Sequence, residues 1–420
     1  MGGKHPAPSC DELLSFMAEY GRSYIASGGP TSRLEEALAG LGLKLDVPTD
    51  VFATPTGIFV SCHDQTGANR TTLSRIKDSG INLGKLCWLE GIFEDVMTGK
   101  LSVQHADKIL RSRHVQRSPY KLWQMVMASF LSGFALSVTG FSLFWPALAS
   151  GFISMATWWV SGPGLRSRVT SSIFRDFMGA VVTLGLASVF QLWMAAPFEA
   201  LSIGGLVILV PGLTLTTAIA ELADQNLVSG TAKLMQAVLT LLALGLAYML
   251  FQDLSEALHL AAAPSAGPRP QALAVSAFGM MVSAACWSVI FRVPPRSLPW
   301  ATLTGMLGWF ILKMFASSQY LAAASFLAAL AVGFVSLAFS TRYKVPSQVF
   351  SVPGIIAMLP GMLALTSLRS FAAGNQDHGL ELGFRVAATA GSIVFGLFTA
   401  RIPFAFKPRI KLFSAFRARH

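Results

Sequence analysis

The chain has few charged residues for its length. Of its 420 residues, 13% are Asp, Glu, Lys or Arg and 53% are hydrophobic, whereas an ordinary globular domain carries about 25% charge. A water-soluble protein of this composition could not cover its surface with polar groups. The shortage of charge therefore excludes a disordered chain, a coiled coil, a secreted disulfide scaffold and most soluble enzymes.

Cysteine is also scarce, and the motifs of covalent and nucleotide chemistry are missing. The four cysteines match no zinc or redox spacing and indicate no disulfide framework. A nucleophile elbow, a zinc-protease motif and a P-loop are absent, so we expect no metal and no other cofactor. The run Cys62-His63-Asp64 does not form a catalytic dyad, because neighbouring residues on a strand point to opposite faces.

Long apolar runs are absent from the first 120 residues, which carry 13 basic and 13 acidic side chains. This polar start has no secretory signal peptide, so we expect it to stay in the cytoplasm. Helical and strand patterns, with Asp11 and Thr31 opening the first two helices, predict an α+β domain over residues 1–118. The expected helices cover 11–26, 32–41, 83–98 and 103–112, and the expected strands cover 51–53, 57–62 and 71–77.

The net charge of +11 lies entirely in residues 121–420, which hold 19 basic and 8 acidic side chains. A nucleic-acid-binding patch would be expected on the soluble part instead, so we expect no nucleic-acid partner. From Leu122 onward, ten apolar segments have roughly the length that spans a membrane. They are approximately 122–140, 143–160, 176–194, 201–219, 232–251, 272–291, 299–314, 320–340, 347–366 and 383–402.

Lys and Arg are distributed unevenly between the apolar segments. With the N-terminus inside, the inside segments carry 18 Lys and Arg residues and the outside segments carry 4. By the positive-inside rule, both termini are then cytoplasmic, and residues 406–420 form a basic cytoplasmic tail. The sequence therefore predicts a polytopic α-helical membrane protein.

An internal repeat divides the ten segments into five and five. A shift of 149 residues places 205–213 on 354–362, so that the Pro-Gly pair of the fourth segment falls on that of the ninth. Because each half has an odd number of spans, the halves 119–252 and 270–405 enter the membrane from opposite sides. This 5+5 inverted repeat is typical of transporters.

The Pro-Gly pairs predict two broken helices near the middle of the membrane. Helix N-termini attract a carboxylate and C-terminal carbonyls attract an ammonium group, so a zwitterionic amino acid suits such a site. Two alternatives remain open: the prolines merely kink the helices, and the threonines merely satisfy freed backbone groups. The candidate substrate-binding residues are Pro211, Gly212, Thr214, Thr216, Thr217, Pro353, Gly354, Pro360 and Gly361.

These stretches resemble the bacterial threonine/serine exporter family. The resemblance is carried by 26–37 (ASGGPTSRLEEA), by 51–58 with 80–86, and by the Pro-Gly regions of both halves. It implies an N-terminal hydrophilic domain, about ten spans, and export of L-threonine and L-serine across the bacterial inner membrane, driven by the proton motive force. The implied partners are these amino acids, protons and the lipid bilayer, and a homo-oligomer stays open.

Two groups of polar residues are further candidates. Proton coupling needs a titratable group in or near the membrane, and the candidates are Asp176, Glu221 and Asp224. The alternative for Asp176 is a surface ion pair with Arg175 at the membrane interface, and the alternative for Glu221 and Asp224 is a solvated acid in a loop. In the N-terminal domain, some motif residues form either a regulatory or ligand pocket or ordinary surface pairs. The motif residues are Arg33, Glu35, Thr54, Thr56, Asn82 and Lys85.

The main alternative function is a membrane-anchored hydrolase or ligand sensor that acts through residues 1–118. Ten spans are far more than an anchor requires, so we expect a secondary transporter and not an enzyme.

Overall fold

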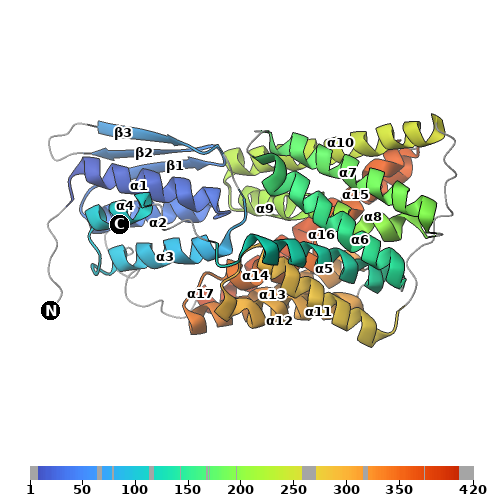
Figure 1. The fold of residues 1–420 in the computed structure, drawn as a ribbon. Helices are drawn as coiled ribbons and strands as arrows, with labels where there is room; N and C mark the ends of the chain where they lie inside the picture. The colour runs from blue at the N-terminus through green and yellow to red at the C-terminus, as the bar shows by residue number, and fades with distance from the viewer. Residues whose placement is uncertain are drawn as a thin grey trace.

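The computed structural model describes residues 8–405 apart from 64–68, 78–79, 113–117, 142, 167–168, 170, 195, 258–270, 316–319 and 373. The predicted tail 406–420 and Asp64 lie outside the described residues. Residues 8–112, here called the N-terminal part, lie at one end of a long helical bundle (Figure 1).

The N-terminal part combines helices with an antiparallel sheet of order β1-β2-β3. The sheet forms from two adjacent hairpins, and the first turns between Thr54 and Gly57. Its elements are α1 (Cys10–Ala26), α2 (Thr31–Lys44), β1 (Thr49–Thr54), β2 (Gly57–His63), β3 (Asn69–Arg75), α3 (Leu83–Met97) and α4 (Val103–Arg111). Each lies where the sequence predicts an element of that type.

Helix α1 packs on the sheet through its apolar face. Phe16 and Tyr20 of α1 and Ile58 of β2 are fully or almost fully buried in one core. The approach is close, because a Cβ atom on Gly21 would lie 2.3 Å from the Ile58 Cδ1. Asp11 does not cap α1 as expected. Ser9 does, since its hydroxyl accepts from the Glu12 N–H while its own N–H donates to the Glu12 carboxylate at 2.9 Å.

The rest of the described chain is helical and is here called the membrane part. Its helices form the long bundle seen in Figure 1. In chain order they are α5 (Leu122–Phe141), α6 (Phe144–Trp159), a π-helical turn η2 (Val160–Gly164), α7 (Ser172–Trp193), α8 (Phe198–Leu209), α9 (Gly212–Ala223), α10 (Leu227–Ala257), α11 (Leu273–Ile290), the short turn η3 (Pro295–Ser297), α12 (Leu298–Phe315), α13 (Leu321–Tyr343), α14 (Gln348–Ile355), the short turn η4 (Ile356–Met358), α15 (Gly361–Ala372), α16 (Gln376–Thr399) and α17 (Ile402–Ala405).

Eight helical stretches of the described residues are long and apolar enough to cross a membrane. Helices α8 and α9 count together as one stretch, and so do α14 and α15. Large apolar side chains also remain exposed on these helices, for example Trp193 at 85% and Phe384 at 78%. Lipid, not water, suits such a surface, so the chain is a multi-pass membrane protein.

Of the ten predicted spans, 143–160 and 299–314 correspond to helices outside those eight. The first is α6, whose 16 residues are shorter than a typical span. The second is α12, which has 18 residues and Lys313 in its last turn.

Helix contacts in the two halves follow the same pattern under the shift of 149 residues. Helix α6 packs on α8 as α12 packs on α14, and α10 packs on α9 as α16 packs on α15. The halves also exchange contacts, because α9 lies against α16 and α15 lies against α10. The first helices of the two halves, α5 and α11, pack on each other.

Candidate functional site

The two predicted helix breaks exist, and they touch each other. Helix α8 ends at Leu209 and α9 begins at Gly212, while α15 begins at Gly361 after the turn at Met358. A Cβ atom on Gly361 would lie 2.4 Å from the Val210 Cγ1 and 3.6 Å from the Gly212 Cα. A Cβ atom on Gly212 would lie 3.0 Å from the Leu359 Cβ. Glycine therefore permits the backbones of the two breaks to come together.

The threonines after the first break bond to nearby backbone carbonyls. The Thr216 hydroxyl donates to the Gly212 carbonyl at 3.0 Å, and the Thr217 hydroxyl donates to the Thr214 carbonyl at 3.0 Å. Both acceptors are carbonyls within α9, three or four residues before the threonine, which is a usual bond for threonine in a helix, and neither is a carbonyl that Pro211 frees in the preceding turn. Each hydroxyl oxygen keeps lone pairs that can accept from a donor such as an ammonium group.

The other Pro-Gly pair of the second half, Pro353-Gly354, lies away from this contact. Pro353 and Gly354 lie inside α14, and a Cβ atom on Gly354 would be 2.4 Å from the Val332 Cγ1. The residue that aligns with Gly354 under the shift, Gly205, packs against Thr183 in the same way, at 2.6 Å. Thr183 in turn aligns with Val332. Pro353 and Gly354 thus hold α14 against α13 and not against the first break.

Among the three candidate acids, Glu221 is the one built into a buried network. It lies near the end of α9 and is 3% exposed. The Lys233 ammonium of α10 lies 2.5 Å from its carboxylate, and the Ser229 hydroxyl donates to the other carboxylate oxygen. The backbone N–H and the hydroxyl of Thr31 also donate to the carboxylate oxygen that Lys233 contacts, at 3.3 Å and 3.2 Å. The alternative interpretation of Glu221, a solvated acid in a loop, is therefore wrong.

The other two acids have fewer partners. Asp224 follows α9, and burial raises the pKa of its carboxyl, while Arg401 and a hydrogen bond from Ser32 lower it. Asp176 lies in the first turns of α7 beside Arg175, whose guanidinium donates to the Val169 carbonyl at 2.6 Å. The sequence predicts Asp176 and Arg175 at the membrane interface. In the structure both residues lie near the start of α7.

The polar partners of Glu221 are residues that sequence reasoning missed. In the sequence, Lys233 counted only among the basic residues of the inside segments, Ser229 belonged only to the stretches that carry the family resemblance, and Asn226 was not a candidate. The Asn226 amide donates to the Thr31 hydroxyl at 2.9 Å. One signal was available: a lysine within two turns of the start of a long apolar helix needs a nearby acid.

The motif residues of the N-terminal part do not form one pocket. The Glu35 carboxylate accepts from the Ala53 N–H at 2.6 Å, which ties α2 to β1. Asn82 caps α3 by accepting from the Lys85 N–H at 3.0 Å. The Thr54 hydroxyl donates to the Gly57 carbonyl at 3.0 Å and lies 3.4 Å from the Thr56 hydroxyl within the same turn. These bonds build local structure.

Arg33 points instead to the membrane part. Its guanidinium lies 3.4 Å from the Glu90 carboxylate and donates to the Gln348 side chain at 3.3 Å. Gln348 is the first residue of α14, so Arg33 links α2 to the second half. The Tyr24 hydroxyl is buried near this pair, and among the described residues it has no hydrogen-bond partner.

The cysteines differ from the expectation in one respect. Cys10 and Cys62 form a disulfide, 52 positions apart. The packing of α1 on β2 brings them together, which spacing in the sequence could not show. Cys62 is fully buried and His63 is exposed on the opposite face of β2, so they do not meet as a dyad.

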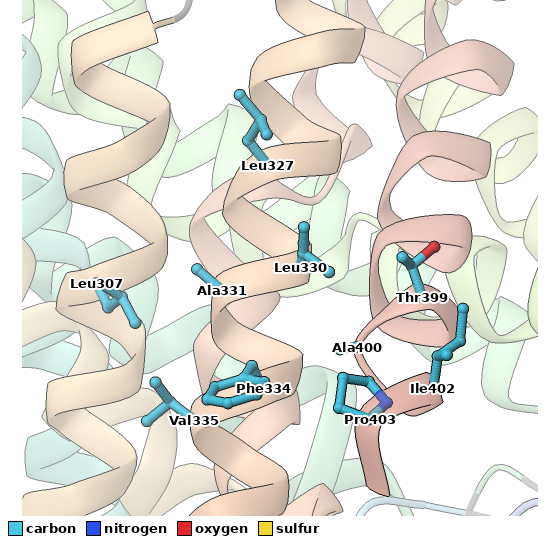
Figure 2. A pocket seen from close by; sticks show the side chains of 10 residues that line it. All are labelled: Leu307, Leu327, Leu330, Ala331, Phe334, Val335, Thr399, Ala400, Ile402 and Pro403. Carbon is cyan, nitrogen blue, oxygen red and sulfur yellow. The ribbon is translucent and has the colours of Figure 1, made fainter. Parts of the chain in front are cut away.

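A groove of about 640 Å³ opens on the membrane part between α12, α13, α16 and α17. Thr399 is the polar member of its lining, and its hydroxyl already donates to the Phe395 carbonyl at 2.7 Å. Such a lining offers a zwitterion no charge partner, so the groove is no candidate for an amino-acid site (Figure 2). It is lined by Leu307, Leu327, Leu330, Ala331, Phe334, Val335, Thr399, Ala400, Ile402 and Pro403.

Comparison with known proteins decides the family. A family model described as "Putative threonine/serine exporter" matches residues 15–254, and a second, described as "Threonine/Serine exporter, ThrE", matches residues 276–402. The chain belongs to the threonine/serine exporter family. Members of this family are membrane transporters and not enzymes, so the hydrolase alternative is not favoured.

Individual relatives of this exporter-family chain are distant. A "Probable threonine/serine exporter" of Mycobacterium tuberculosis is 25% identical over 83% of the chain and 68% of its own length. "Pheromone-regulated membrane protein 10" of Candida albicans is 28% identical over 55% of the chain but only 21% of its own length. The same-named protein of Eremothecium gossypii is 25% identical, over 55% of the chain and 32% of its own length. No solved structure matches the chain.

Proposed function

We propose that this exporter-family chain carries L-threonine and L-serine out of the bacterial cytoplasm across the inner membrane, driven by the proton motive force. The predicted N-terminal domain, residues 1–118, and the tail, residues 406–420, are then cytoplasmic. The positions of basic residues support this orientation. Lys233 bonds to Glu221 beside the N-terminal part, and Arg401 lies near Asp224 at the same end of the bundle.

The transporter architecture is a 5+5 inverted repeat over residues 119–252 and 270–405. The matching helix contacts of the two halves support it, as do the exchanged contacts of α9 with α16 and α10 with α15. The broken helices run in opposite senses, because α9 ends beside the N-terminal part while α14 begins there. Two halves of opposite orientation provide the two access states that a secondary transporter needs.

The contact between the two breaks is the observation that carries the substrate site. Pro211 and Pro360 have no N–H, so neither can donate the helical hydrogen bond to the preceding turn, and the backbone is interrupted at each break. Thr214, Thr216 and Thr217 follow the first break and provide hydroxyl oxygens for a small polar substrate. A substrate bound between Gly212 and Gly361 must move the two halves apart, which couples binding to a change of access.

For proton coupling, Glu221 is favoured over Asp176 and Asp224. It lies in the half-helix that follows the first break, and it is buried with a basic partner in Lys233. Protonation of Glu221 would leave Lys233 without its counter-charge, so the proton and the position of α10 are energetically linked.

Uptake into inverted membrane vesicles tests this function. We expect labelled threonine and serine to accumulate when a proton gradient is imposed, and to stop accumulating when an uncoupler removes it. Accumulation of neither amino acid, with the protein intact in the membrane, would refute the proposal. Accumulation that ignores the uncoupler would refute proton coupling alone.

A further inference from the structure

The N-terminal part is joined to the second half of the membrane part by an apolar core. The buried residues that the membrane part adds to this core all come from the second half: Trp287, Phe291, Val293, Ala301, Val349 and Phe350. Hydrogen bonds add to the join. The Leu83 N–H of the N-terminal part donates to the Phe291 carbonyl at 3.0 Å, and the hydroxyl of Tyr120, which follows this part in the chain, donates to the Val293 carbonyl at 2.8 Å. Apolar contact of this kind favours movement as one body.

The contact with the first half is of another kind. Strand β1 approaches α10, and the first-half residues Val207, Ile208 and Leu213 pack against the same core but are only partly buried. The hydrogen bonds between the N-terminal part and the first half gather around Thr31. Thr31 donates twice to Glu221 and accepts from Asn226. The neighbouring Ser32 bonds to Asp224. Water can replace hydrogen bonds of this type when they separate, whereas it cannot replace a buried apolar core.

The first turn of α2 depends on Glu221 for its cap. Pro30, the residue before α2, makes no side-chain capping bond. The Thr31 N–H therefore donates to an acceptor in the membrane part, the Glu221 carboxylate. The negative carboxylate also suits the positive end of a helix. Glu221 does not depend on α2 in return, because Ser229 and Lys233 belong to its own half and stay with it.

We propose that Thr31, Asn226 and Glu221 form a latch between the two moving bodies of the transporter. The N-terminal part travels with the second half, and the latch holds it closed over the ends of α9 and α10. When Thr31 separates from Glu221, the transporter opens on the side that faces the N-terminal part. While the latch is open, the Lys233 ammonium still balances the negative charge of Glu221. This inference rests on the proposed transport function.

Hydrogen exchange on the unmodified protein in lipid nanodiscs provides the first test. Two backbone amides report on the two contacts: Thr31 donates to the first half and Leu83 donates to the second. With saturating threonine or serine, whichever the protein transports in vesicles, we expect the peptide at the start of α2 to exchange several-fold faster. The peptide at the start of α3 should not change. Equal responses of the two peptides would overturn the latch.

If no amino acid is transported, the proposed function fails and the latch is still tested. Without substrate, the start of α2 must then exchange faster than the start of α3, since polar contacts open more readily than apolar ones. Slower exchange at α2 would overturn the latch independently of transport.

Cross-linking provides the second test, in a background where Cys87 and Cys286 are serine. Thr31→Cys with Asn226→Cys joins the latch, and Leu83→Cys with Phe291→Cys joins the N-terminal part to the second half as a matched control. We expect oxidation to reduce transport at least tenfold in the latch pair and reductant to restore it. The control pair should transport equally in both states. Transport by the oxidised latch pair, or its loss in the oxidised control pair, would overturn the proposal.

Discussion

Thr31 and Glu221 lie 190 positions apart in the chain, and the backbone N–H and the hydroxyl of Thr31 both donate to one oxygen of the Glu221 carboxylate. The first residue of a helix in the N-terminal part is thereby capped by an acid of the membrane part. The same carboxylate holds Lys233 of α10. One side chain thus connects three elements, and its charge state affects all of them.

Replacing Glu221 should separate its structural role from its role in transport. Glu221→Gln keeps the shape but leaves the largely buried Lys233 without a counter-charge, which should cost about 3 kcal/mol of stability. Adding Lys233→Met should recover most of that loss without restoring proton-driven transport. Thermal unfolding in detergent and vesicle uptake measure the two effects. The exposed Glu381→Gln, which loses a surface pair with Arg385, is the control and should change little.

The result that would contradict this prediction is full proton-driven transport by Glu221→Gln with Lys233→Met. Glu221 would then be only a structural acid, and Asp176 and Asp224 would become the remaining candidates for proton coupling.

The sequence could predict features that depend on local pattern or on the repeat. The helices of the N-terminal part follow from apolar spacing, and the two breaks follow from Pro211-Gly212 and Pro360-Gly361 at matched positions. Pattern alone was enough in these cases because each feature is set by neighbouring residues or by symmetry.

The sequence could not predict contacts made by folding across long separations. Glu221 reads as a loop acid because its partner Thr31 lies in another part of the chain. Cys10 and Cys62 read as unpaired for the same reason. The alternative for Thr216 and Thr217 was left open because a hydroxyl near a broken helix can serve the backbone or a substrate, and only coordinates show which acceptor is within reach.

The contact between the breaks leaves no room for a methyl group. Gly361→Ala would bring its Cβ to 2.4 Å from the Val210 Cγ1, so we expect about 1–3 kcal/mol of destabilisation and loss of transport. Gly212→Ala should have a smaller effect on stability, because its nearest neighbour would lie at 3.0 Å. Thermal unfolding and vesicle uptake measure the two outcomes.

Two other membrane glycines provide matched controls for this prediction. Gly185 of α7 and Gly391 of α16 have no heavy atom within 4 Å of an added Cβ. Their alanine variants should keep transport and gain up to about 1 kcal/mol from helix propensity. If Gly361→Ala transported as well as these controls, the contact between the breaks would not be the substrate site.

The Cys10–Cys62 bond should stabilise the N-terminal part. It closes a loop between residues 52 positions apart, for which chain entropy predicts an upper value of about 4 kcal/mol. Reductant should therefore lower the unfolding midpoint of the wild type to that of Cys10→Ser with Cys62→Ser, which should not respond to reductant. Thiol labelling of the unfolded protein gives the number of free cysteines directly. Four labelled cysteines without reductant would show that the pair is not bonded, as a cytoplasmic location would favour.

Glu90 should make the stability of the N-terminal part depend on pH. Burial raises the pKa of its carboxyl above the usual value, although Arg33 at 3.4 Å lowers it in part. The folded state then holds the proton more tightly than the unfolded state, so stability should fall as pH rises from the usual carboxyl range through the raised pKa.

Glu90→Gln cannot ionise and should unfold at a higher temperature than wild type at neutral pH, with the difference closing in acid. The exposed Glu94, one turn further along α3, adds a like charge that also raises the pKa of Glu90, so Glu94→Gln should reduce the pH dependence without removing it. If Glu90→Gln instead unfolded at a lower temperature than wild type at neutral pH, the Arg33 ion pair would outweigh burial, and Glu90 would be ionised to hold α2 and α3 together.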